Sequence, residues 1–238
     1  MTIALMCLPY AGAGASLFRP WREQPDRAFQ VTPIQLPGRE ERFIEDPYTS
    51  VGEAAAGCAE RVTAAAQGRQ FALFGHSFGA VIAYETARLL VADGAPLPQR
   101  LIVSGAAAPG VARPYLGVDG LSDDELVERV GALAGYDHEA FADPDLRELI
   151  VPALRADMAI NETYRPGTVD PLPVPITVLR GMDDDLVTRM DAELWSGHTT
   201  AGYELLDMPG GHMYFAEDWQ GLWAKLDVVL RDVARRLP

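Results

Sequence analysis

Short apolar runs alternate along this chain with longer stretches of helical spacing, and this alternation constrains the fold most. Runs bounded by glycine, proline or polar residues predict buried strands at Ile3–Leu8, Val31–Leu36, Phe71–Phe74, Leu101–Ser104, Ile176–Leu179 and Tyr203–Asp207. Helical spacing predicts helices at Val51–Ala66, Phe78–Ala92, Leu121–Leu133, Pro144–Ile160, Thr188–Gly197 and Phe215–Leu237. Several strands are apolar on both faces, which is typical of a parallel sheet covered by helices on both sides. The sequence therefore predicts an α/β fold with a mostly parallel central sheet.

One long stretch interrupts this alternation. Between about Pro109 and Pro171 no convincing strand pattern appears, and helix-like pieces are joined by proline, glycine and aspartate. This stretch is too long for a simple connection between two consecutive strands. We therefore expect a helical lid inserted at about residues 109–171. The length of 238 residues suits one α/β unit, so residues 1–238 are expected to form a single domain.

The charge balance and the cysteine count limit the function classes. Lys and Arg number 20 against 34 Asp and Glu, which gives a net charge of −14 and argues against sequence-independent nucleic-acid binding. Cys7 and Cys58 make neither a disulfide framework nor a metal-binding cluster. The N-terminus lacks a charged leader, and no apolar run reaches 18 residues. We expect a cytoplasmic protein that neither spans a membrane nor holds a structural metal.

The strongest motif is Gly75-His76-Ser77-Phe78-Gly79, which joins a predicted strand to a predicted helix. A sharp turn of this kind exposes a serine hydroxyl at the carboxyl end of a sheet, and its glycines leave room for the backbone. The N-terminus of the following helix also points its positive end at the site. Ser77 is therefore the predicted nucleophile, against the alternative of a plain glycine-rich turn.

A serine nucleophile needs a base, and the chain offers four histidines. His212 lies in a glycine-rich loop after the last predicted strand, and it comes last in the Ser-Asp-His order of the α/β-hydrolase fold. His76 adjoins Ser77 and is expected to be structural, whereas His138 reads as a surface residue. His198 lies near a helix end, where a capping or exposed role is expected. His212 is the predicted base.

The third triad member should be a carboxylate on the loop after the strand that precedes the strand of His212. Three aspartates follow that strand, and the spacing Gly181-x-x-Asp184-x-x-Val187 favours Asp184. Asp183 and Asp185 remain alternatives for the triad acid. The competing interpretation of the aspartate run is a solvated acidic turn.

An oxyanion hole is predicted from two backbone N–H groups. One belongs to Phe78, the residue after the nucleophile, and the other to Ala11 in the loop after the first strand, with Tyr10 as an alternative. Small residues in that loop allow close approach of a ligand. The competing interpretation of Gly12-x-Gly14 as a phosphate-binding turn is disfavoured, because Leu17 stands where a dinucleotide site needs its third glycine.

Together these motifs resemble the type II thioesterases of polyketide and nonribosomal peptide assembly lines. The resemblance covers nearly the whole chain and rests on these stretches: Leu8-Pro-Tyr-Ala-Gly, Gln35-Leu-Pro-Gly-Arg-Glu-Glu-Arg42, Gly75-His-Ser-Phe-Gly-Ala80, Gly181 to Asp184 and Gly210-Gly-His-Met. The Leu-Pro-Gly-Arg-Glu stretch is the most discriminating of them. The chain departs from the family pattern at Gly12-Ala13-Gly14, at Asp184-Asp185 in place of Asp-Pro, and after His212, without losing a triad member.

The resemblance implies an editing hydrolase that removes acyl groups from the phosphopantetheine arm of acyl or peptidyl carrier proteins. It implies a monomer with no cofactor and a mobile lid. One alternative keeps the fold but acts on a free small molecule, as a carboxylesterase, lactonase or lipase. Another alternative is a non-catalytic binding protein of the same fold.

Substrate contacts are expected in the lid and near the N-terminus. Candidate pocket residues in the lid are Phe141, Met158, Ile160 and Tyr164, with packing of the lid as the competing interpretation. Candidate residues for the border of the pantetheine channel are Phe18, Arg39 and Arg42, where ion pairs with Glu40, Glu41 or Glu45 are the alternative for the arginines. Because carrier proteins are usually acidic too, a local basic rim of Arg19, Arg22, Arg39 and Arg42 and a weak, transient docking are expected.

Overall fold

A six-stranded parallel sheet organises the chain. The computed structural model describes residues 2–24, 29–135, 141–167 and 170–235. The strands are β1 (Ile3–Leu8), β2 (Phe29–Pro33), β3 (Phe71–His76), β4 (Leu101–Ser104), β5 (Ile176–Gly181) and β6 (Tyr203–Met208). Their order in the sheet is β2-β1-β3-β4-β5-β6, and every neighbouring pair is parallel. The predicted α/β fold is confirmed.

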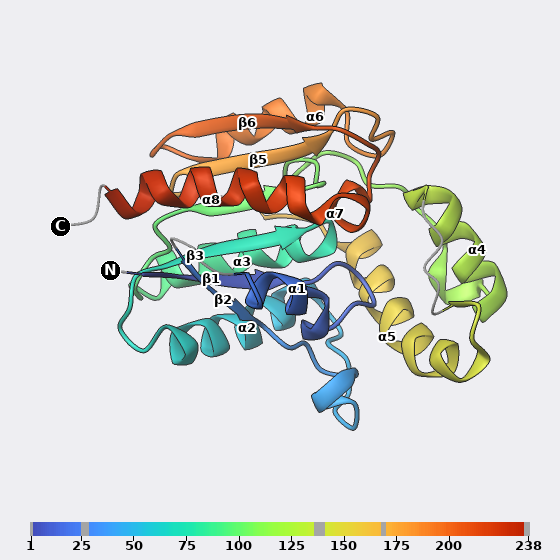
Figure 1. The fold of residues 1–238 in the computed structure, drawn as a ribbon. Helices are drawn as coiled ribbons and strands as arrows, with labels where there is room; N and C mark the ends of the chain where they lie inside the picture. Colours follow the sequence, from blue (N-terminus) through green and yellow to red (C-terminus); the bar gives the residue numbers. More distant parts are fainter. Residues whose placement is uncertain (1, 25–28, 136–140, 168–169, 236–238) are drawn as a thin grey trace.

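Helices cover both faces of the sheet, as Figure 1 shows. They are α1 (Arg19–Arg22), α2 (Val51–Ala66), α3 (Phe78–Ala92), α4 (Asp123–Ala134), α5 (Pro144–Thr163), α6 (Arg189–Glu193), α7 (Tyr214–Glu217) and α8 (Trp219–Arg235). Alternate residues of β1 enter two different cores: Met6 packs on the side of α2 and α3, whereas Leu5 packs on the side of α8. Both faces of β1 are fully buried, which explains its continuous apolar sequence.

Three predicted elements differ from the structure. The helix expected at Thr188–Gly197 is α6 followed by a 3-10 helix at Leu194–His198. Val31–Leu36 was expected as a strand, but β2 is Phe29–Pro33 and the following Ile34 and Leu36 are buried without belonging to it. The helix expected at Phe215–Leu237 is divided into α7 and α8 at Asp218, whose side chain accepts the N–H of Gly221 at 2.9 Å. A side chain that bonds a nearby backbone N–H in this way starts a new helix.

The segment between β4 and β5 contains α4 and α5, and no strand occurs in its described residues 105–135, 141–167 and 170–175. Leu172 makes an isolated bridge with Thr199 just before β5 begins. Figure 1 shows both helices beyond the carboxyl ends of the strands. Ser122 and Glu125 form a reciprocal capping box at the start of α4. None of the helices in the described part of the chain is long and apolar enough to cross a bilayer.

Candidate active site

Ser77 occupies a strained turn between β3 and α3. Its φ of 52° and ψ of −116° are unusual for a residue with a side chain. A Cβ on Gly75 would lie 2.1 Å from the Gly79 carbonyl oxygen, and one on Gly79 would lie 2.4 Å from the Leu8 carbonyl oxygen. The N–H of Ser77 donates to the Ser104 carbonyl at 2.8 Å, which fixes the turn to β4. The two motif glycines are therefore required by backbone contacts, and the expected strand-turn-helix context is present.

Three predicted residues meet in one chain of hydrogen bonds. His212 Nε2 lies 3.1 Å from Ser77 Oγ, and His212 Nδ1 lies 2.9 Å from Asp184 Oδ2. His212 is 7% exposed and Asp184 is 3% exposed, so the pair is shielded from water. The neighbouring Asp183 and Asp185 are exposed. Of the three aspartates in the loop, the structure brings Asp184 to the imidazole.

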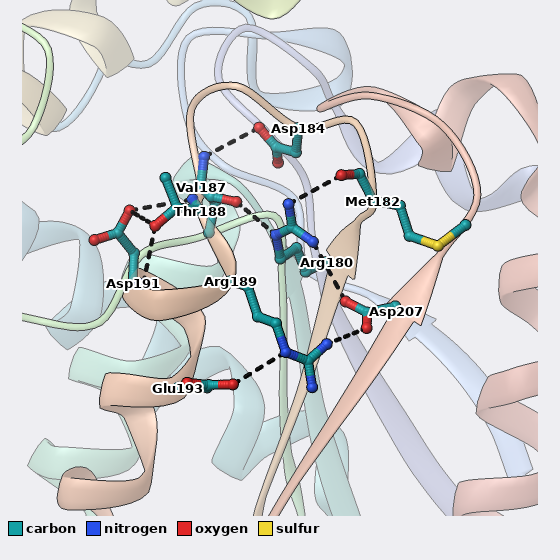
Figure 2. Close-up of polar contacts among 9 residues, drawn as sticks. All are labelled: Arg180, Met182, Asp184, Val187, Thr188, Arg189, Asp191, Glu193 and Asp207. Atoms are coloured by element: carbon teal, nitrogen blue, oxygen red, sulfur yellow. Dashed lines mark hydrogen bonds and ion pairs between the residues drawn. The ribbon is translucent and has the colours of Figure 1, made fainter.

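The loop after β5 holds Asp184 by backbone and side-chain contacts, several of which are drawn in Figure 2. Asp184 Oδ1 accepts the N–H groups of Leu186 and Val187 at 2.8 and 3.1 Å, while Oδ2 remains for His212. Arg180 donates to the Val187 carbonyl at 2.8 Å and pairs with Asp207 on β6 at 3.4 Å. Each carboxylate oxygen thus has its own partners, which orients the group toward the imidazole.

The loops that carry Asp184 and His212 touch each other through their backbones. A Cβ on Gly181 would lie 2.3 Å from the Gly211 carbonyl oxygen and 2.6 Å from that of Gly210. Asp183 N–H donates to the Gly210 carbonyl at 3.0 Å, and Gly210 itself has a φ of +98°. This close approach brings a carboxylate and an imidazole from different loops within hydrogen-bond distance.

The loop after β1 lies against the start of α3. Leu8 and Pro9 carbonyls approach the Cα of Gly79 so closely that a Cβ there would lie 2.4 and 2.5 Å from them. Phe78 is the first residue of α3, where backbone N–H groups have no partner within the helix. Tyr10, Ala11 and Ser77 line one cavity. The position of these groups is compatible with the predicted oxyanion donors, and their role remains a prediction.

A second polar network lies behind the imidazole. His76 is fully buried, its Nδ1 lies 2.8 Å from Ser104 Oγ, and Tyr214 OH hydrogen-bonds that same Oγ. Burial, with a smaller contribution from the neighbouring His212, holds the pKa of His76 well below its ordinary value. A neutral imidazole in a packed position agrees with the structural role expected for this residue.

Of the other two histidines, the structure describes only His198. His198 ends a short 3-10 helix and its Nδ1 lies 3.2 Å from Tyr84 OH. Partial burial lowers the pKa of His198. His138, expected at the surface, lies outside the described residues. Across the described residues, no group of three or more His, Cys, Asp or Glu side chains is arranged to hold a metal ion.

An apolar cavity of about 580 Å³ opens over Ser77 and His212. Helices α4 and α5 supply much of its wall, including Val130, Leu149 and Leu154. Phe141 and Met158, two of the candidate pocket residues, also line it. The other two candidates pack elsewhere: Ile160 is buried in the main core and Tyr164 packs against that core. The cavity can take an extended apolar group whose reactive end reaches Ser77.

Several expectations for the N-terminal region are wrong. Phe18 is fully buried in the core on the α8 side, so it does not border a channel. Arg39 lines the cavity, as expected of a residue that borders a channel, but it is 5% exposed and pairs with Asp157, so it does not belong to a surface rim. Arg42 pairs with Glu45, the competing interpretation, and this hydrogen bond raises the pKa of Arg42. Of the four arginines expected to form the rim, Arg19 and Arg22 on α1 are exposed.

Asp157 was missed by sequence reasoning. It lies on α5, accepts the Gly12 N–H at 2.8 Å and is 3% exposed. Its partner Arg39 is 118 positions away in the sequence, so no local pattern could reveal the pair. The one available signal was an acidic residue among the apolar positions of a helix.

Comparison with known proteins identifies the family. The thioesterase domain model matches residues 4–233. Thioesterase PikA5 of Streptomyces venezuelae is 35% identical over 221 residues, which are 91% of this chain and 77% of that protein. RedJ, a thioesterase from the prodiginine pathway of Streptomyces coelicolor, is 34% identical with a TM-score of 0.87 over 95% of this chain and 89% of its own.

A second solved structure extends the comparison. BorB, described as a type II thioesterase from the borrelidin biosynthetic cluster, is 33% identical with a TM-score of 0.83. The match covers 97% of this chain and 93% of BorB. The fold is thus that of the α/β-hydrolase thioesterases, and the resemblance to type II thioesterases is confirmed. The chain belongs to the thioesterase family.

Proposed function

We propose that the protein is an editing serine hydrolase that cleaves acyl thioesters from the phosphopantetheine arm of carrier proteins in polyketide or nonribosomal peptide synthesis. The observation that carries the proposal is the hydrogen-bonded chain from Ser77 through His212 to Asp184 at the floor of an apolar cavity. The named biosynthetic relatives support the substrate class. In this proposal α4 and α5 form the lid of a single domain.

Acylation begins when His212 Nε2 takes the proton of Ser77 Oγ and that oxygen attacks the thioester carbonyl carbon. Asp184 stabilises the imidazolium, and the N–H groups of Phe78 and Ala11 donate to the oxyanion. When the intermediate collapses, the C–S bond breaks and the pantetheine sulfur leaves with the proton held by His212. The acyl group is then an ester of Ser77.

Deacylation repeats these steps with water. His212 removes a proton from water, the resulting hydroxide attacks the acyl-serine, and the C–O bond to Ser77 breaks as Oγ regains a proton. The products are the free acid and the regenerated serine. Since a thioester is already activated, the main tasks of the protein are positioning and oxyanion stabilisation. The mechanism uses no cofactor.

A carrier protein would deliver its arm near α1. Ser16 and Leu17 line the cavity, and the exposed Arg19 and Arg22 follow directly along the chain. These two arginines form a small basic site on a chain with a net charge of −14. Local charges within about 8 Å dominate at physiological salt, so a short-lived encounter with an acidic carrier is expected. We further propose that the protein acts in the cytoplasm as a monomer.

The test compares two substrates with the same acyl chain. Purified protein is given an acyl carrier protein loaded with hexanoyl or decanoyl phosphopantetheine, or the corresponding free ethyl ester. We expect kcat/KM to be at least about tenfold higher for the carrier thioester, because remote contacts add to transition-state binding. A preference for the ester would replace the editing role by that of a small-molecule esterase. Turnover that rises strongly with salt would show that repulsion dominates and that the arginine site does not attract the carrier.

A further inference from the structure

The buried Arg39–Asp157 pair joins the α4–α5 segment to the loop after β1. Asp157 Oδ2 accepts the Gly12 N–H at 2.8 Å and also pairs with Arg39, whose Nη2 donates to Oδ1 at 2.9 Å. Arg39 also donates to the carbonyls of Ala13 and Pro37, at 3.3 and 3.1 Å. The Asp157 carboxylate thus holds the Gly12 N–H, and the Arg39 guanidinium holds the carbonyl of the next residue, Ala13.

The position of Gly12 makes this contact important for the neighbouring residue. Its N–H belongs to the peptide that follows Ala11, so a fixed N–H restricts ψ rotation at Ala11. Gly12 has a φ of +78°, and a Cβ there would lie 3.0 Å from the Leu154 Cβ on α5. Helix α5 therefore contacts the loop through its packing as well as through Asp157.

We propose that Asp157 is a positioning residue that holds the Ala11 N–H in place for the oxyanion. Helix α5 is then a structural part of the catalytic site as well as a wall of the cavity. This inference rests on the proposed function, because it needs the oxyanion role of Ala11. Movement of α5 away from the loop would break a charge-assisted hydrogen bond and loosen the donor.

Replacing both Arg39 and Asp157 by apolar residues distinguishes an effect on positioning of the loop from the effect of leaving one charge buried without its partner. Loss of one partner would leave a buried unpaired charge and destabilise the fold, whereas two apolar residues of similar size are often tolerated. The main variant is therefore the double substitution Arg39→Met with Asp157→Leu. We expect a folded protein with a lower melting temperature, because the Gly12 N–H and the Ala13 and Pro37 carbonyls lose these partners, and we expect kcat to fall by about 10–100-fold with a smaller change in KM. Asp157→Asn keeps an acceptor for the Gly12 N–H, and we expect a smaller loss of about 3–10-fold.

A fluorophosphonate gives a readout that does not depend on the natural substrate. Its reaction with Ser77 also develops charge on an oxygen in the oxyanion hole, so the phosphonylation rate should fall in step with kcat. The matched control is Asp124→Asn, which removes an exposed ion pair with Arg147 on the same segment and should leave both rates unchanged.

The results distinguish failure of the proposed function from failure of the positioning role. If the wild type is phosphonylated but does not hydrolyse carrier thioesters, the proposed function fails while the phosphonylation rates still test Asp157. A folded double variant with wild-type kcat and phosphonylation rate would overturn the positioning role. If the double variant does not fold, Asp157→Asn decides, and a wild-type kcat there would likewise overturn it. A wild type that resists the phosphonate would overturn both proposals.

Discussion

The cavity over Ser77 has two walls that are built differently. The sheet wall consists of loops that directly follow β3, β5 and β6. Its hydrogen bond between His212 and Asp184 is buried, and the one between His212 and Ser77 is partly buried. The α4 side of the opposite wall has one buried residue, Leu126, in the helix Asp123–Ala134. Its pairs with α5, Asp123–Arg155 and Asp124–Arg147, are largely exposed and contribute little stability.

Under the proposed function, the two walls would have different tasks: one would carry the reaction and the other would select the acyl chain. Catalytic groups need fixed distances, and the backbone contacts of the sheet wall provide them. An acyl chain needs an apolar surface that adapts to its length, and a weakly attached helix can provide it. Helix α5 lines the cavity and is also tied to the rest of the protein, since its Asp157 pairs with Arg39 and Tyr164, the residue after the helix, donates to Glu85.

The largest effects are expected on the sheet wall. Ser77→Ala and His212→Ala should each lower kcat by about 10⁴–10⁶-fold, because nucleophile and base act as one unit, and the double variant should be little worse. Steady-state kinetics on an acyl thioester measures the loss. His198→Gln is the control, because that imidazole contacts Tyr84, and it should keep most of the activity. A modest loss in Ser77→Ala would show that the catalytic serine lies elsewhere.

The next effect tests the choice among the three aspartates. Asp184→Ala should lower kcat by about 10³–10⁴-fold, since the imidazole loses its orienting partner. Asp183→Ala and Asp185→Ala remove exposed carboxylates and should change kcat by less than about threefold. Kinetics of the three variants under the same conditions makes the comparison. If Asp183 or Asp185 proves the costly residue, the orientation of this loop must be revised.

Thiol reactivity compares the core around the sheet with helix α5 without any substrate. Burial raises the pKa of Cys58 to about 12 and that of Cys7 well above its ordinary value, so both thiols stay protonated and inaccessible. A cysteine introduced at the half-exposed Leu146 on α5 should react with a thiol reagent at least about 100-fold faster at pH 8. A colorimetric thiol assay on native protein measures the rates. Fast reaction of Cys7 in the wild type would show that the core around β1 opens readily.

A buried neutral imidazole should make the sheet wall acid-sensitive. The pKa of His76 is lower in the folded chain than in the unfolded one, so the unfolded state gains a proton first as the pH falls. This contribution to stability is complete above about pH 6.5 and is lost below it, by at most about 1.4 kcal/mol per pH unit. Urea unfolding between pH 5 and 8 should show a weaker dependence in His76→Asn. Parallel curves for the two proteins would contradict the expected protonation state.

The smallest effects are expected on the opposite wall, which α4 and α5 form. Met158→Trp adds volume to the cavity wall and should lower kcat/KM for decanoyl more than for acetyl substrates, by about 3–10-fold. Hydrolysis of a series of acyl chain lengths measures the change. Val228→Trp on the outer surface of α8 is the control, because Val228 is exposed and distant from the cavity lining. An equal loss for all chain lengths would show that Met158 affects the chemical step.

Local patterns predicted the sheet and three members of the site. Strand β1 is apolar throughout because both its faces are buried, and the glycines around Ser77 mark a turn that only small neighbours permit. Apolar patterns gave wrong bounds where residues outside a strand are also buried. Ile34 and Leu36 are buried after β2 has ended, so an apolar run extended the predicted strand too far.

Long-range ion pairs were not predictable from patterns. Arg39 has acidic neighbours in the sequence, which made Glu40 and Glu41 the natural candidates for its partner. Its partner in the structure is Asp157 on α5, between β4 and β5. No sequence motif around Asp157 indicates that it pairs with an arginine. A contact between positions 118 residues apart depends on the packed fold.

The contact between Gly181 and Gly211 bears on how other chains of this fold can be interpreted. Any side chain at position 181 would collide with the backbone that leads into His212. A substitution at Gly181 would therefore displace the loop of Asp184, the loop of His212 or both. Transplanting either loop alone into another scaffold would therefore separate the carboxylate from the imidazole. A glycine at this position in the sequence indicates that the loop after β5 and the loop after β6 are in backbone contact. The two loops should therefore be exchanged together.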